Sequence, residues 1–112
     1  MNIVRVIYRW HVEKENFPEF KRLWQSATYK VSEKDIGSYG SFLLRSNCDE
    51  REVIIIEKWK SISAWKRFEG KLELKETIKA SALGDCISVE AYEEIEDHTK
   101  RRKIEIFDLL SS

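Results

Sequence analysis

Two polar side chains near the start of the chain, Tyr8 and His11, could take part in chemistry. A tyrosine hydroxyl among apolar side chains needs a hydrogen-bond partner, and a ligand could supply it. Histidine takes up or releases a proton near neutral pH and could act as a base. Both stand in the alternating stretch over residues 3–12, on opposite faces of a predicted strand. Tyr8 is therefore the first candidate for a catalytic residue. His11 is the second, and its alternative is a place at the surface or in a subunit interface.

Several aromatic side chains could line a pocket next to Tyr8. One shares the face of Tyr8 on the strand, and others belong to apolar stripes at helical spacing over residues 17–32 and after Ser61. The alternative is that these side chains only form the core between the sheet and the helices. The candidate pocket residues are Trp10, Trp24, Tyr39, Trp65 and Phe68, and the second choices are Tyr29 and Trp59.

Six elements are predicted to position these side chains. Strands are expected over residues 3–12, 41–45, 53–59 and 86–92, and helices over residues 17–32 and from Ser61 onward, with Asn16 and Ser61 as capping residues. This order is that of a split βαβ unit. It predicts an α+β, ferredoxin-like domain in which both helices cover one face of an antiparallel four-stranded sheet. Residues 71–82 have a composition compatible with helix but a weaker period.

The other face of the sheet would need a cover of its own. Four β-branched residues in a row at positions 53–56 indicate that their strand is buried on both faces. An apolar face left bare would be a large exposed patch, so we expect a homodimer formed through the sheet faces. Arg9 is expected to pair with Glu57 or Glu90, across the sheet or the dimer.

The end of the chain differs in composition from the rest. Residues 96–112 form a charged extension to a domain of residues 1–95, with an acidic block followed by a basic one. The apolar residues that follow fit either helix or strand. We expect an additional short element here, which docks on its own subunit or on the partner.

The composition argues against several classes of protein. The chain of 112 residues is long enough for one domain, and its 20 basic and 20 acidic residues give a net charge of zero, which is atypical of a general nucleic-acid binder. The longest aliphatic run, residues 53–56, is far too short to span a membrane, and Arg5 and Arg9 interrupt the apolar stretch that a signal peptide would need. We therefore expect a soluble cytoplasmic protein with neither nucleic acid nor membrane as a partner.

The cysteines and histidines give no sign of a metal site. Cys48 and Cys86 are far apart in sequence, which is more typical of reduced, structural cysteines than of a disulfide. His11 and His98 have no neighbours at metal-ligand spacing. We expect no metal and no cofactor.

Three segments resemble the antibiotic biosynthesis monooxygenase domain. They are RWHVEKENFPEFKRLW at residues 9–24, GSYGSFLLR at residues 37–45 and EKWKSISAWKRF at residues 57–68. The resemblance extends over about residues 1–95 and implies a ferredoxin-like subunit paired into a dimeric α+β barrel. None of these motifs is itself a catalytic motif, and what they indicate is the fold. The family includes cofactor-independent monooxygenases of polycyclic phenols and quinols, haem-degrading enzymes and proteins that process signal molecules.

The haem-degrading branch of this family fits poorly. Its catalytic asparagine, its tryptophan on the second helix and its axial histidine would fall at Tyr8, Phe68 and near Ile78. All three positions depart from that pattern, so haem degradation is not expected.

The resemblance therefore favours a monooxygenase that works without metal or flavin on a small aromatic compound of the phenol or quinol type. Such chemistry needs an apolar pocket and a donor or base for the phenolate. Tyr8 would supply the hydrogen bond, in a pocket between the sheet and the helices. The alternative is a non-catalytic dimer of the same fold that binds a small molecule or only assembles. The substrate and the pathway do not follow from the sequence.

Overall fold

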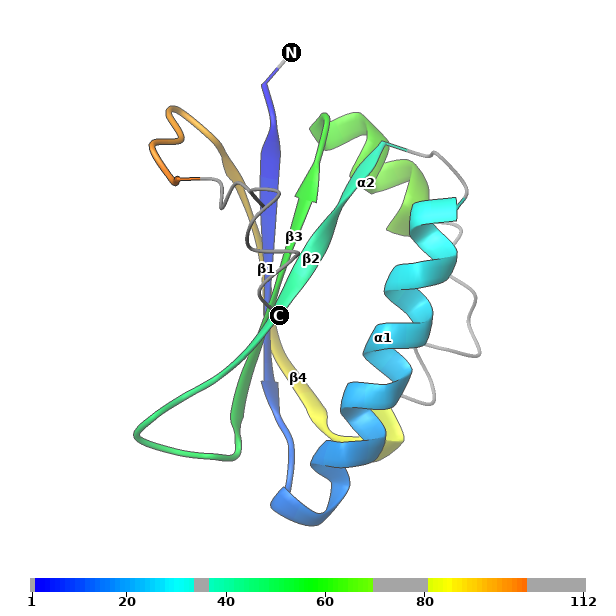
Figure 1. Ribbon diagram of the computed structural model, residues 1–112, viewed down its shortest axis with the longest axis vertical. Helices are drawn as coiled ribbons and strands as arrows, with labels where there is room; N and C mark the ends of the chain where they lie inside the picture. Colours follow the sequence, from blue (N-terminus) through cyan, green and yellow to red (C-terminus); the bar gives the residue numbers. More distant parts are fainter. Residues whose placement is uncertain (1, 34–36, 70–80, 101–112) are drawn as a thin grey trace, which may run out of the picture.

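The computed structural model describes residues 2–33, 37–69 and 81–100 (Figure 1). The elements are β1 (Val4–His11), the short 3-10 helix η1 (Lys14–Asn16), α1 (Phe17–Glu33), β2 (Ser38–Arg45), β3 (Glu52–Trp59), α2 (Ile62–Glu69) and β4 (Asp85–Glu93). The predicted order of strands and helices is confirmed.

The strands form one antiparallel sheet in the order β2-β3-β1-β4. Both helices lie on the same side of this sheet, as Figure 1 shows. We call the face under the helices the inner face and the opposite one the outer face. This is the predicted α+β, ferredoxin-like arrangement.

The core lies between the inner face and the helices. Alternate residues of β1, including Val4, Val6 and Trp10, are buried there, as the alternation predicts. Two buried clusters divide this layer, one around Trp59 and Trp65 and the other around Trp10 and Phe20. Each large apolar side chain that folding removes from water contributes about 1.5–3 kcal/mol, so these clusters are a main source of stability.

The ends of several elements differ from the prediction. β2 begins at Ser38, three residues before the predicted start, and Gly40 within it adopts a φ of 101° where the pairing with β3 shifts register. A glycine tolerates that conformation, so the turn signal that it carries is a bulge inside the strand. Asn16 lies in the 3-10 helix and not at an N-cap, because helical backbone already starts at Lys14. Ser61 caps α2 as predicted, since its Oγ accepts a hydrogen bond of 3.1 Å from the Ala64 amide.

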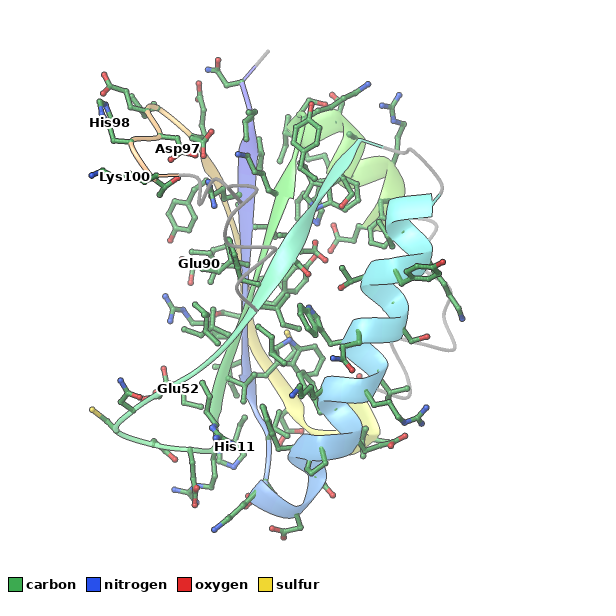
Figure 2. All side chains as sticks on the ribbon, viewed as in Figure 1. His11, Glu52, Glu90, Asp97, His98 and Lys100 are labelled. Atoms are coloured by element: carbon green, nitrogen blue, oxygen red, sulfur yellow. The ribbon has the colours of Figure 1, made fainter. Side chains whose placement is uncertain are left out.

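The outer face carries exposed apolar side chains and a segment of the tail. Phe42 and Leu44 on β2 are 59% and 46% exposed. Asp97 binds Arg5 at 3.3 Å and Lys58 at 3.8 Å on this face, and Figure 2 shows it on the side of the sheet away from α1. Residues 94–100 are neither helix nor strand. Residues 101–112 and 70–80 lie outside the described residues. The additional C-terminal element therefore stays a prediction, and most of the stretch at residues 71–82, whose composition is compatible with helix, is not described.

Candidate functional site

Tyr8 lies in the middle of β1, on the inner face. Its neighbours in the sheet are Ile55 of β3 and Val89 of β4, and its ring packs against both core clusters. The side chain is half-buried. The indole Nε1 of Trp65 on α2 donates a hydrogen bond of 2.9 Å to the Tyr8 hydroxyl. Two of the side chains predicted for one pocket are therefore in direct contact.

A carboxylate from the adjacent strand joins this contact. Glu57 of β3 stands opposite the fully buried Val6 in the register, so it points to the inner face. Trp59 Nε1 donates a hydrogen bond of 3.1 Å to Glu57 Oε1. The Tyr8 hydroxyl lies close enough to this carboxylate for each group to shift the pKa of the other. We call Tyr8, Glu57, Trp59 and Trp65 the inner polar cluster.

Burial changes the acidity of both titratable groups in the cluster. Burial, and after it the negative charge of Glu57, raises the pKa of Tyr8 far above its ordinary value, so the hydroxyl stays protonated. Burial also raises the pKa of Glu57, with a further contribution from the charge of Glu69, while the hydrogen bond from Trp59 and the nearby Tyr8 hydroxyl oppose the shift. The cluster therefore combines a permanent hydroxyl donor with a carboxylate that takes up a proton more readily than a carboxylate in water.

Three other predicted pocket residues lie in the same layer, each with a contact of its own. Phe68 packs on Trp59 with ring centroids 5.0 Å apart, next to the inner polar cluster. Trp24 donates a hydrogen bond of 2.9 Å to Ser41 Oγ of β2. Trp10 belongs to the other core cluster, where its ring meets Phe20 edge-on at 5.2 Å, and its buried Nε1 has no hydrogen-bond partner among the described residues.

Two predicted residues lie apart from this layer. Tyr39 is 59% exposed on β2 and lines a groove that includes Phe42 and Asp97. His11 ends β1 on the outer face, where its Nε2 lies 2.9 Å from Glu13 Oε1 (Figure 2). The structure thus brings Tyr8, Trp65 and Phe68 close together and leaves Tyr39 and His11 outside.

The sequence reasoning did not identify Glu57 as a site residue. Glu57 is predicted only as one of two partners for Arg9, and in the structure Arg9 pairs with the other, Glu90, at 3.7 Å. The signal was nevertheless in the sequence, because Glu57 alternates with Ile55 and Trp59 and must share their face. A carboxylate on a buried strand face needs hydrogen-bond donors, which here come from aromatic side chains.

Three grooves outlined by described residues lie outside this layer. One of about 370 Å³ lies between the start of α2 and β4, next to Ser61, Ile62 and Ala91. Two others, of about 490 and 640 Å³, lie on the outer face beside Asp97. Tyr8 lines none of these three.

The described part of the chain contains no group of three or more histidine, cysteine, aspartate or glutamate side chains that could hold a metal ion. Neither of its helices is long and apolar enough to cross a membrane. Cys48 and Cys86 are both free and exposed.

Comparison with known proteins agrees with this architecture. The sequence model of the antibiotic biosynthesis monooxygenase family matches residues 3–80. A structure of SnoaB, a cofactor-independent oxygenase from Streptomyces nogalater, is similar over 89% of this chain and 100% of its own, with a TM-score of 0.77 and 16% identity. A conserved protein from Methanosarcina mazei is similar over 82% of this chain and 92% of its own, with a TM-score of 0.68 and 19% identity.

A conserved protein of unknown function from Bacteroides thetaiotaomicron covers 83% of this chain and 98% of its own, with a TM-score of 0.69 and 16% identity. No curated protein sequence matches the chain. At these identities the similar structures establish the fold alone, whereas the family model extends over more than half of the chain. The chain belongs to the antibiotic biosynthesis monooxygenase family.

Proposed function

We propose that the protein is a cofactor-independent monooxygenase that oxidises a small phenol or quinol with molecular oxygen. The observation that carries this proposal is the inner polar cluster. It holds a hydroxyl that stays protonated, that of the half-buried Tyr8, among aromatic side chains in a member of this family. The oxygenase activity of SnoaB, which has the same fold, supports the same reaction class.

In such a reaction the substrate itself supplies the electrons. A phenol that becomes a quinone loses two hydrogen atoms and gains one oxygen atom from O₂, and the second oxygen atom leaves as water. The phenolate is the form that passes electrons to oxygen, so the protein has to stabilise negative charge on the substrate oxygen. Tyr8 would donate a hydrogen bond to that oxygen, while Trp65 holds the hydroxyl in place through its indole N–H.

Oxygen uptake tests this function directly. The purified protein is mixed with each of a panel of naphthols and hydroquinones in buffer that contains a chelator and no flavin. The concentration of dissolved oxygen is measured with an electrode. We expect enzyme-dependent uptake, and Tyr8→Phe to lower kcat by about 10²-fold, as the loss of one oxyanion donor typically does. The matched control is Tyr29→Phe, which removes a hydroxyl from a side chain that is 68% exposed on α1. Absence of uptake over the panel, or full activity of Tyr8→Phe, would contradict the proposal.

A non-catalytic binding protein of the same fold is the second candidate. It is favoured by the existing contact of the Tyr8 hydroxyl, which already accepts a hydrogen bond from Trp65. Binding of an aromatic compound at Tyr8 without oxygen uptake would support this candidate instead.

We also propose that the protein is a homodimer that pairs through the outer faces of its sheets, and that it resides in the cytoplasm. Exposed Phe42 and Leu44 on the outer face support the first proposal, since apolar side chains there would be covered by a partner. Two free, exposed cysteines, Cys48 and Cys86, are consistent with a reducing compartment.

A further inference from the structure

We propose that Glu57 accepts the proton of the substrate hydroxyl, and that the site therefore prefers aromatic compounds with a free hydroxyl over their O-methyl ethers. This inference rests on the proposed function, because it names the proton acceptor and the substrate class of that same site. It adds a residue that neither the sequence motifs nor the family match assigns.

The contacts of Glu57 are the first argument. Its described hydrogen-bond partner is the Trp59 indole, which is neutral, and the neighbouring Tyr8 hydroxyl is neutral as well. The cations of the neighbouring strand point to the outer face, where Arg5 pairs with Glu94 at 2.8 Å and Arg9 pairs with Glu90. A carboxylate on an inner face is costly when its described partners carry no positive charge. Such a placement is typical of a group that takes part in proton transfer.

The position of Glu57 beside Tyr8 is the second argument. Both side chains are half-buried, so each keeps some surface that a ligand could reach. A ligand oxygen that accepts a hydrogen bond from Tyr8 would lie next to the Glu57 carboxylate, because both side chains lie on the inner face of adjacent strands and each shifts the pKa of the other. One substrate hydroxyl could therefore accept from Tyr8 and donate to Glu57 at the same time.

The proton transfer is compatible with the balance of atoms and electrons in the proposed oxidation. The substrate O–H bond breaks, its proton moves to a Glu57 carboxylate oxygen, and the electron pair stays on the substrate oxygen, which Tyr8 stabilises. O₂ then takes electrons from the phenolate and supplies the new oxygen atom. The proton held on Glu57 and the hydrogen lost from the ring carbon leave with the other oxygen atom as water.

The surroundings of Glu57 make it a stronger base than an exposed glutamate. Burial raises the pKa of Glu57, and Glu69 at the end of α2 raises it further. The groups that face it from the described elements are Tyr8 of β1, Trp59 of its own strand and Glu69 of α2. Of these, Glu69 is the one whose negative charge strengthens Glu57 as a base. The site is therefore suited to bind the neutral phenol and then to remove its proton.

Binding of 2-naphthol and 2-methoxynaphthalene, measured by calorimetry near neutral pH, tests the inference. The two compounds differ in the hydroxyl hydrogen that Glu57 would receive. We expect the unmodified protein to bind 2-naphthol about tenfold more tightly, as a hydrogen bond to a charged acceptor predicts. Glu57→Gln should reduce this preference at least about fivefold. Glu52→Gln, on the same strand but exposed on the outer face, should leave the preference unchanged.

The outcomes separate this inference from the proposed function. Equal affinity for the two compounds in the unmodified protein, or an undiminished preference in Glu57→Gln, would overturn the role of Glu57 and leave the aromatic site intact. Failure of both compounds to bind would overturn the aromatic site and, with it, both proposals. Should Glu57→Gln fail to fold, the unmodified protein still gives an answer. Its preference for 2-naphthol should fall as the pH is lowered through the raised pKa of Glu57, and a constant preference would overturn the inference.

Discussion

Tyr8 and Glu57 illustrate how far the position and the contacts of a single residue can be predicted from the sequence. The strand alternation was sufficient to place Tyr8 on the inner face, because a period of two leaves no other choice next to Val6 and Trp10. The partner of its hydroxyl was not predictable, because the contact with Trp65 depends on how α2 crosses the sheet. Glu57 was overlooked because an acidic residue suggests an ion pair first, and only the register shows which face it occupies.

The free energy of unfolding should depend on pH through Glu57. Its pKa is raised in the folded state, so the folded protein binds a proton more tightly than the unfolded chain. The resulting stabilisation is complete below the ordinary pKa of a glutamate and is lost as the pH rises through the raised pKa. We therefore expect Glu57→Gln to gain stability relative to the unmodified protein as the pH rises from acid to neutral. Urea denaturation at a series of pH values would measure this difference.

The control for this experiment is Glu52→Gln, whose exposed carboxylate lies on the opposite face of the same strand. Its stability relative to the unmodified protein should not show this rise. A stability difference for Glu57→Gln that stays constant, or falls, between acid and neutral pH would mean that the folded state does not favour the protonated carboxyl.

At the scale of the elements, the backbone at Gly37 lies close to α2, and a substitution there should change the stability of the fold. Gly37 precedes β2 with a φ of 93°, and a Cβ placed there would lie 3.0 Å from the Ala64 Cβ of α2. Gly37→Ala should therefore destabilise the fold through both backbone strain and this contact. The strain at a left-handed residue alone costs about 1–3 kcal/mol. Thermal or urea unfolding would measure the loss.

Gly40→Ala is the matched control, because Gly40 has a φ of 101° but a Cβ added there would have nothing within 4 Å. It should show the cost of strain without the contact with α2. A loss for Gly37→Ala that is no larger than the loss for Gly40→Ala would show that the packing of this turn against α2 contributes nothing to stability.

The order of the elements was predictable because hydrophobic period distinguishes strands from helices wherever one face is buried. The stripes that contain Trp24 and Trp65 and the alternation of β1 all depend on that single condition. The ends of β2 were not predictable in the same way, since Gly40 supports a turn and a bulge equally well. The tail segment at residues 94–100 has no period, and its position follows from ion pairs that the sequence does not specify.

At the scale of the whole molecule, the tail and the proposed dimer meet on the outer face. Asp97 neutralises Arg5 and Lys58 there, on the face that we propose pairs with a second copy. A symmetric interface presents the same surface from both subunits, so any unpaired cations on it come in pairs. Removal of Asp97 would leave Arg5 without one of its two acidic partners and Lys58 without its described one. In the full chain, the tail would therefore help assembly by neutralising these positive charges on the interface.

Truncation after residue 95 should therefore weaken dimerisation, and Asp97→Asn should weaken it in the same direction by a smaller amount. Since the effect is a repulsion between like charges, added salt should reverse much of it. Light scattering over a range of concentrations, at low and high salt, would measure the dimer fraction. Glu96→Gln is the control, because its described partner is the exposed His98 and not a residue of the sheet. A truncated chain that dimerises as well as the full chain would show that the tail has no part in assembly, and tighter pairing would mean that it shields the outer face from a second copy.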